Sequence, residues 1–178
     1  MQTPSQPFSP AEFRKVMSTF ATGVTLVTTR AGEVIHGLTA NAFCSLSLDP
    51  PLVLVCVDKQ AQSHNLIIEG RCFAINILNA NQQALAERFS QNHLEGKERF
   101  AGAAYHQAET GAPILENVLS WLDCKLVAAH EGGDHTIFVG EAVALGNGEE
   151  AAPLLYFRSQ YHNAEPQPNE EQPRMRAN

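Results

Sequence analysis

The sequence predicts a mainly β fold with short helices, arranged as an antiparallel barrel or sandwich. About seven or eight extended segments follow one another along the chain, and most of them are rich in β-branched and aromatic residues. Only brief helical patterns interrupt them, whereas a parallel sheet would need a helix between each pair of strands. The clearest extended segments lie at 24–29, 52–57, 72–78, 121–129, 135–145 and 154–157, and the helical patterns at 65–69 and 82–90.

The first element is a helix with recognisable ends. Ser9 can cap it, Pro10 suits its first turn, and Glu12 completes a capping box. Apolar side chains then recur at helical spacing, at Phe13, Val16, Met17 and Phe20. This stripe predicts a face that packs on another part of the structure. We expect Gly23 to end the helix and a hairpin with its turn at 30–33 to follow.

One domain accounts for the chain. Its 178 residues, with a mass of 19.4 kDa, match the size of a single ordinary domain. We expect residues 9–162 to form this domain, because the strand and helix patterns lie within them. Residues 1–8 are predicted to be a flexible N-terminus. Residues 163–178 contain three prolines and few apolar side chains, so we expect a flexible tail there.

Charge and hydropathy exclude two classes of partner. The chain has 12 basic and 19 acidic residues, a net charge of −7, and its basic residues are scattered singly. This pattern argues against binding to nucleic acid. The longest apolar run, 52–57, is far shorter than the roughly 20 residues of a membrane-spanning helix, and no secretory signal precedes it. We expect a cytoplasmic protein without nucleic-acid or membrane partners.

Neither a disulfide nor a metal site is predicted. The four cysteines form no C-x-x-C pair and each lies in an apolar segment, so buried reduced thiols are expected at Cys44, Cys56, Cys72 and Cys124. Residues 130–135 bring two histidines and two carboxylates around a predicted turn. Their spacing matches no familiar metal motif, and a hairpin tip ordinarily gathers polar residues.

The segment 38–48 has the alternation of a strand. One face is apolar, and the other carries Thr39, Asn41, Phe43, Ser45 and Ser47. A solvent-facing strand ordinarily carries charged side chains, whereas uncharged donors and acceptors beside an aromatic ring suit a half-buried heteroaromatic ligand. The alternative is a barrel strand whose hydroxyl groups bond to neighbouring loops.

Two further positions suit a nucleotide-like ligand. Lys59 and the hydroxyl of Ser63 stand near the start of a short predicted helix, where backbone N–H groups can bind a phosphate. A plain helix cap by Ser63 is the alternative. His135 begins a strand, and its imidazole could lie beside a cofactor or be an ordinary strand-end histidine.

Six motifs then follow one another along most of the chain. They are ATGVTLVTT at 21–29, GLTANAFCSLSLDPPLVLVCVDK at 37–59, GRCFAINIL at 70–78, LAERFS at 85–90, GDHTIFVGEAV at 133–143 and PLLYFRSQY at 153–161. In sequence and in order they closely resemble the flavin reductase-like family. That family includes the reductase components of two-component aromatic monooxygenases.

The resemblance implies an FMN-binding split β-barrel that forms a homodimer, with the flavin near the subunit interface. It also implies the use of NADH or NADPH to reduce FMN or FAD, which then leaves for a partner monooxygenase. The family's flavin contacts fall on Thr39, Ala40, Asn41, Ser45, Ser47 and Tyr161, its phosphate region on Lys59 and Ser63, and its nicotinamide-side histidine on His135. Ser159 departs from the family, where many members have glycine, and this makes the contacts of Tyr161 less secure.

Two other functions remain open from the sequence. One is an electron-carrying FMN protein or a ferric-chelate reductase of the same fold, and the other is a barrel that has lost flavin and acts as an interaction module. Hydride transfer itself requires no acid or base from the protein. The choices between NADH and NADPH, and between FMN and FAD, are also open.

Overall fold

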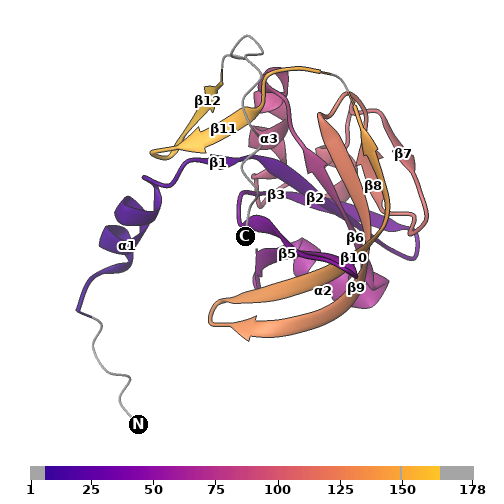
Figure 1. Ribbon diagram of the computed structural model, residues 1–178, viewed down its shortest axis with the longest axis horizontal. Helices are drawn as coiled ribbons and strands as arrows, with labels where there is room; N and C mark the ends of the chain where they lie inside the picture. The colour runs from indigo at the N-terminus through magenta and orange to yellow at the C-terminus, as the bar shows by residue number, and fades with distance from the viewer. Residues whose placement is uncertain (1–6, 149, 165–178) are drawn as a thin grey trace.

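The computed structural model describes residues 7–148 and 150–164, which are built around a seven-stranded sheet (Figure 1). Its strand order is β3-β2-β6-β9-β10-β5-β4, and every pairing is antiparallel. The strands are β2 (Thr25–Ala31), β3 (Val34–Ala40), β4 (Phe43–Leu48), β5 (Pro51–Asp58), β6 (Cys72–Ile77), β9 (Ser120–Gly132) and β10 (His135–Asn147). The predicted mainly β architecture is confirmed.

The sheet is rolled so that its two ends approach each other. Strands β3 and β4 follow each other in the chain but lie at opposite edges of the sheet, with only residues 41–42 between them. Strand β3 also contacts β5, the neighbour of β4. An antiparallel sheet that curls in this way buries a core on its concave side.

Smaller elements surround the sheet. The helices are α1 (Pro10–Met17), α2 (Gln62–Gly70), η1 (Ala80–Gln82), α3 (Gln83–Phe89) and α4 (Gly96–Arg99), and the remaining strands are β1 (Thr22–Gly23), β7 (Tyr105–Gln107), β8 (Pro113–Leu115), β11 (Leu154–Phe157) and β12 (Gln160–Asn163). None of the helices among the described residues is long and apolar enough to span a membrane. Asn163, predicted to begin the tail, is the last residue of β12. The rest of that tail from 165 onward, and residues 1–6, lie outside the described residues.

The core consists of two main hydrophobic clusters on either side of β2. Val27 packs with Val55, Phe73 and Phe138 in the first cluster. Its neighbour Leu26 points the other way, into a cluster that includes Leu78, Phe89, Phe100 and Leu115. Both faces of this strand are buried because successive side chains of a strand alternate between faces.

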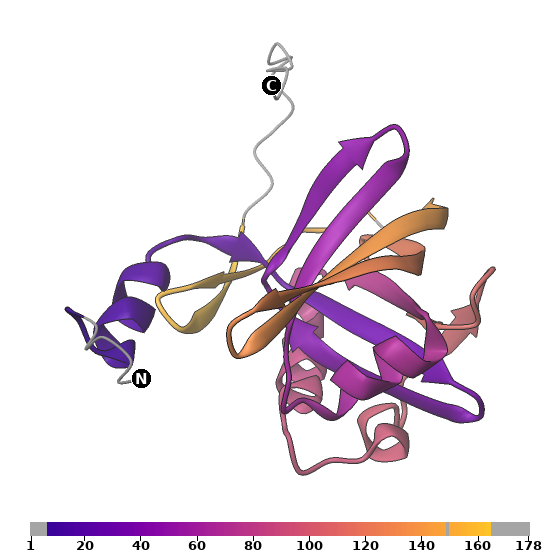
Figure 2. The ribbon, with the colours of Figure 1, turned by 90° about the horizontal axis from the view of Figure 1, so that it is seen from below.

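Helix α1 differs from its prediction at its end and in its packing. The capping box of Ser9 and Glu12 is present, but the helix ends at Met17 instead of Gly23, which belongs to β1. Its apolar stripe is exposed, with Phe20 at 69%. Figures 1 and 2 show α1 standing apart from the large sheet. The predicted packing of this stripe is therefore not met by the described part of this chain.

The segment 38–48 is two strands instead of one. The chain leaves β3 after Ala40 and enters β4 at Phe43. A β-bulge then follows, because Ser45 lies opposite Val53 whereas Ser47 lies opposite the adjacent residue of β5, Leu52. Adjacent strand residues face opposite sides, so the two serines do not share a face. The single uncharged face predicted from the alternation is wrong.

The prediction for the cysteines is only partly correct. Cys72 and Cys124 are buried, but Cys56 is only partly buried and Cys44 is exposed on β4; all four are free thiols. Burial, together with the nearby Asp123 carboxyl, raises the pKa of Cys124 to about 12.

A close approach inside the core gives the first prediction. A Cβ on Gly140 would lie 2.4 Å from Phe73 Cζ and 2.9 Å from Cys124 Cβ. Gly140→Ala should therefore lower the free energy of unfolding by about 1–3 kcal/mol. Gly23→Ala is the control, because nothing lies within 4 Å of its Cβ position. Denaturant unfolding measures both, and equal midpoints for the two variants would contradict this packing.

Candidate functional site

Two adjoining cavities share Thr39 and Ser90 in their walls. The first, which we call the Arg99 cavity, has a volume of about 270 Å³ and is also lined by His36, Leu38, Asp58, Gln60, Ala61, Gln62, Ser63, Phe89, Asn92 and Arg99. The second, the Tyr161 cavity, has a volume of about 400 Å³ and is also lined by Val24, Asn41, Glu87, Tyr156, Ser159 and Tyr161. The two cavities therefore adjoin one another at β3 and the end of α3, and together they are the candidate site.

The Tyr161 cavity brings together three of the predicted flavin contacts, Thr39, Asn41 and Tyr161. The Thr39 hydroxyl donates to the carbonyl oxygen of Ala86, 2.6 Å away, and so ties β3 to α3. The Tyr156 and Tyr161 rings meet edge to face with centroids 5.4 Å apart. Burial raises the pKa of Tyr161, which keeps its hydroxyl protonated and able to donate at neutral pH.

The turn between β11 and β12 explains the departure at Ser159. Arg158 and Ser159 have φ angles of 49° and 61°, the left-handed conformation at both central positions of a type I′ turn. Glycine adopts this conformation without strain, and serine does so at some cost. The Arg158 N–H anchors the turn by donating to the Ser18 carbonyl, 2.7 Å away. Tyr161 therefore still lines the cavity although glycine is missing.

A buried histidine occupies the wall of the Arg99 cavity. His36 is 4% exposed, its Nε2 lies 2.8 Å from Gln62 Oε1, and its Nδ1 lies 2.6 Å from Ser63 Oγ. Because a carbonyl oxygen only accepts, Nε2 carries the proton and the Ser63 hydroxyl donates to Nδ1. Burial, and then the positive charge of Arg99, lower the pKa of His36. Ser63 itself is fully buried, so its hydroxyl proton is committed to His36.

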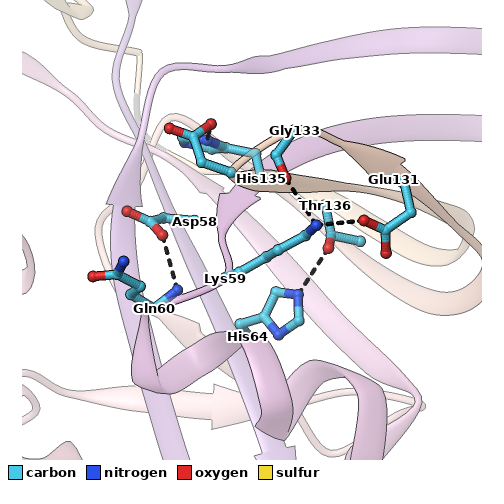
Figure 3. A network of polar contacts seen from close by, with 9 residues as sticks. Asp58, Lys59, Gln60, His64, Glu131, Gly133, His135 and Thr136 are labelled. Atoms are coloured by element: carbon cyan, nitrogen blue, oxygen red, sulfur yellow. Dashed lines mark hydrogen bonds and ion pairs between the residues drawn. The ribbon is translucent and has the colours of Figure 1, made fainter. Parts of the chain in front are cut away.

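Lys59 points away from both cavities. Figure 3 shows its ammonium group between the Glu131 carboxylate and the Gly133 carbonyl, to which it donates at 2.8 Å. The Lys59 N–H also donates to the Asp134 carbonyl at 3.0 Å. The Lys59 charge lowers the pKa of Glu131 in return. This lysine therefore fastens the loop after β5 to the turn between β9 and β10.

His135 lies opposite Asp58, a residue that lines the Arg99 cavity. It pairs with Asp58 across β10 and β5, and residues directly opposite in antiparallel strands project to the same face. Asp58 lines the cavity, whereas His135 does not, and its side chain is 41% exposed. Its Nδ1 lies 2.7 Å from Asp134 Oδ1, and this contact lowers the pKa of Asp134.

The other predicted contacts lie outside the cavity walls. Ser45 and Ser47 belong to β4, and neither lines the two cavities. Ala40 is buried at the end of β3, where its carbonyl accepts a hydrogen bond of 2.7 Å from Thr25. Roles for these three residues in flavin binding stay predictions.

Comparison with known proteins decides the family. Residues 17–165 match the model of the flavin reductase like domain. The chain belongs to the flavin reductase-like family. It is 37% identical over 162 residues to the reductase subunit of a flavin-dependent monooxygenase from Rhodococcus jostii, covering 91% of this chain and 82% of that protein. It is 40% identical over 144 residues to an FMN reductase (NADH) from Agrobacterium fabrum, covering 81% and 80%.

The fold of this flavin reductase-like protein also matches solved structures. The NADH:FAD oxidoreductase of Streptomyces globisporus, in complex with NAD and FAD fragments, superposes with a TM-score of 0.84 at 32% identity. The match covers 94% of this chain and 100% of that one. The predicted family and fold class are therefore confirmed.

Sequence reasoning missed His36 and Arg99 in this flavin reductase-like protein. His36 precedes a glycine in a hairpin, and Arg99 stands among charged residues in the run GKER. Such a run ordinarily indicates a solvated helix face, yet Arg99 is only 3% exposed. No sequence pattern distinguishes one buried arginine from its exposed neighbours.

The buried His36 predicts how stability depends on pH. Because its pKa is lowered in the folded protein, the unfolded chain binds a proton below about pH 6.5 that the folded protein does not bind. The free energy of unfolding should therefore fall between about pH 7.5 and 5.5. The fall should be smaller in His36→Gln than in the wild type or in His93→Gln, which changes an exposed histidine. Identical slopes in all three proteins would refute this assignment.

Proposed function

We propose that this protein is an NADH- or NADPH-dependent flavin reductase that supplies reduced FMN or FAD to a partner monooxygenase. The observation that carries the proposal is the pair of adjoining cavities in a member of the flavin reductase-like family. One cavity offers uncharged polar groups and tyrosine rings, and the other contains a buried guanidinium group. The related FMN reductase (NADH) and monooxygenase reductase subunit support the same activity.

The residues of the two cavities fit a flavin nucleotide. A flavin has a planar ring with carbonyl and imine edges, joined by a polar chain to a phosphate. The Thr39 and Asn41 side chains and the Tyr161 ring match the first part, because they offer hydrogen bonds and aromatic surface without a fixed positive charge. When bound, the flavin supplies the chemistry of hydride acceptance from a nicotinamide.

The protein's own contribution is placement. Thr39 is fixed by its bond to Ala86, and the amide of Asn41 is held by a 3.2 Å bond to the Thr22 hydroxyl. Groups held in this way orient a ligand without further reorganisation, and their dipoles can stabilise negative charge on it. His135, which pairs with Asp58 of the Arg99 cavity, is the proposed contact on the nicotinamide side.

The test is an oxidation assay of NADH and NADPH with and without added FMN or FAD. We expect flavin-dependent turnover, and Asn41→Ala should raise the KM for flavin by about tenfold because one oriented amide is lost. Asn147→Ala, which removes an exposed amide on β10, should not change it. Flavin binding without nicotinamide oxidation would indicate an electron carrier, and no flavin binding would overturn the proposal.

We also propose that a second copy of this chain covers α1. Phe13, Val16 and Met17 are 50% or more exposed on a helix that stands apart from the sheet (Figure 2). Phe8 stacks on Phe13 with ring centroids 6.1 Å apart, which extends the apolar surface. A contiguous apolar face of this kind marks an interaction site in an ordinary soluble domain.

The homodimer has a direct test. The double variant Phe13→Glu/Val16→Glu should sediment as a monomer at concentrations where the wild type is a dimer, because charges replace the apolar contact. Lys15→Glu is the control, since it changes charge on the same helix outside the stripe. A wild-type protein that sediments as a monomer would disprove the dimer.

A further inference from the structure

Arg99 is a buried cation in the wall of a cavity. It is the last residue of α4 and is only 3% exposed. Its Nε donates to the Leu94 carbonyl at 3.0 Å, one Nη to the Gln91 carbonyl at 2.6 Å, and the other to the Phe89 carbonyl. These bonds hold the loop 89–94 in place, but carbonyl groups are neutral. They do not cancel the charge.

The charge of Arg99 has no ionic partner within 7–148 and 150–164. None of the ion pairs in these residues includes Arg99. Three carbonyl oxygens take three of the five N–H groups of a guanidinium, so donors remain for a further acceptor. The charge acts within the cavity, since it lowers the pKa of His36. A buried cation without a counter-charge is costly, and an anionic ligand would offset that cost.

The other side chains that were predicted to bind a phosphate, Lys59 and Ser63, already interact with other residues. The Lys59 ammonium is neutralised by Glu131, and the Ser63 hydroxyl donates to His36. Asp58, exposed at the edge of the same cavity, carries a negative charge that would repel a phosphate placed beside it. Arg99 is thus the positively charged side chain that lines this cavity.

We propose that the Arg99 guanidinium binds the phosphate group of a bound nucleotide in the Arg99 cavity, in place of the Lys59 ammonium. The nucleotide is the flavin or the nicotinamide dinucleotide, so the inference rests on the proposed function. Guanidinium is suited to this task because its planar N–H groups bind two phosphate oxygens at once. The two cavities adjoin at Thr39 and Ser90, and we expect one nucleotide to occupy both.

The test compares FMN with riboflavin, which lacks the phosphate. Arg99→Met should weaken FMN binding by about 10- to 100-fold and riboflavin binding by less than about 3-fold. Arg99→Lys should restore part of the difference because it restores the charge. A merely structural role, in holding the loop 89–94, would weaken both ligands equally. Fluorescence titration of the wild type and both variants with each ligand measures the six dissociation constants.

Two matched controls accompany these variants. Arg88 is also an arginine that donates to a backbone carbonyl, that of Ala101, but it does not line the Arg99 cavity. Arg88→Met should leave the ratio of FMN to riboflavin affinity unchanged. Lys59→Met should also leave this ratio unchanged. If Lys59→Met selectively weakens FMN or NADH while Arg99→Met selectively weakens neither, the proposal is overturned.

A second variant keeps the proposal testable if Arg99→Met does not fold. Asn92 lines the cavity and is exposed, and it makes none of the bonds that fix Arg99. Asn92→Asp adds a negative charge at nearly constant shape. It should weaken FMN about tenfold and leave riboflavin unchanged, because only the phosphate is repelled. Affinities for FMN and riboflavin and a KM for NADH that are all unchanged from the wild type in Asn92→Asp would refute the proposal.

The KM for NADH, measured with riboflavin as the electron acceptor, distinguishes the two possible sources of the phosphate, the flavin and the nicotinamide dinucleotide. If Arg99→Met weakens FMN alone, the cavity binds the flavin phosphate. If it raises the KM for NADH alone, the cavity binds the dinucleotide pyrophosphate; both results support the proposal. The proposal is overturned if Arg99→Met selectively weakens neither FMN nor NADH. Absence of NADH- or NADPH-dependent flavin reduction in the wild type would instead contradict the proposed function.

Discussion

The crossing of the chain between the two edges of the rolled sheet determines where the functional groups lie. Strand β3 pairs with β2 at one edge, and two residues later the chain begins β4 at the other. Asn41 lies in this crossing, and Thr39 lies just before it near the end of β3, so both side chains reach the cavity walls. The bond from Thr39 to Ala86 then fixes α3 beside them.

The two positive charges near the site, on Lys59 and Arg99, differ in whether a carboxylate pairs with them. Lys59 is paired with Glu131 and serves to join two loops, as Figure 3 shows. Arg99 is buried with carbonyl groups only, so its charge acts on the cavity and on His36. In the sequence, Lys59 and Arg99 carry the same positive charge. Burial and pairing, which depend on the whole fold, decide which of them is available to a ligand.

The sequence predicted the elements better than their relative positions. The capping box at Ser9, the long strands and the family were all correct, because local patterns and ordered motifs carry them. The alternation of 38–48 failed because a period of two continues through a crossing and hides a bulge. The stripe of α1 is a correct local pattern, but the pattern does not tell whether this chain covers it, and the described residues leave it exposed. The burial of Arg99 depends on the packing of its surroundings and leaves no local pattern.

The most direct measurement is a crystal structure of the protein with FMN bound. We expect the flavin ring beside Thr39 and Tyr161 in the Tyr161 cavity, with its phosphate against the Arg99 guanidinium. A phosphate bound at Lys59, with the ion pair between Lys59 and Glu131 broken, would contradict the proposal that Arg99 binds the phosphate. A flavin bound away from both cavities would contradict the assignment of the site itself.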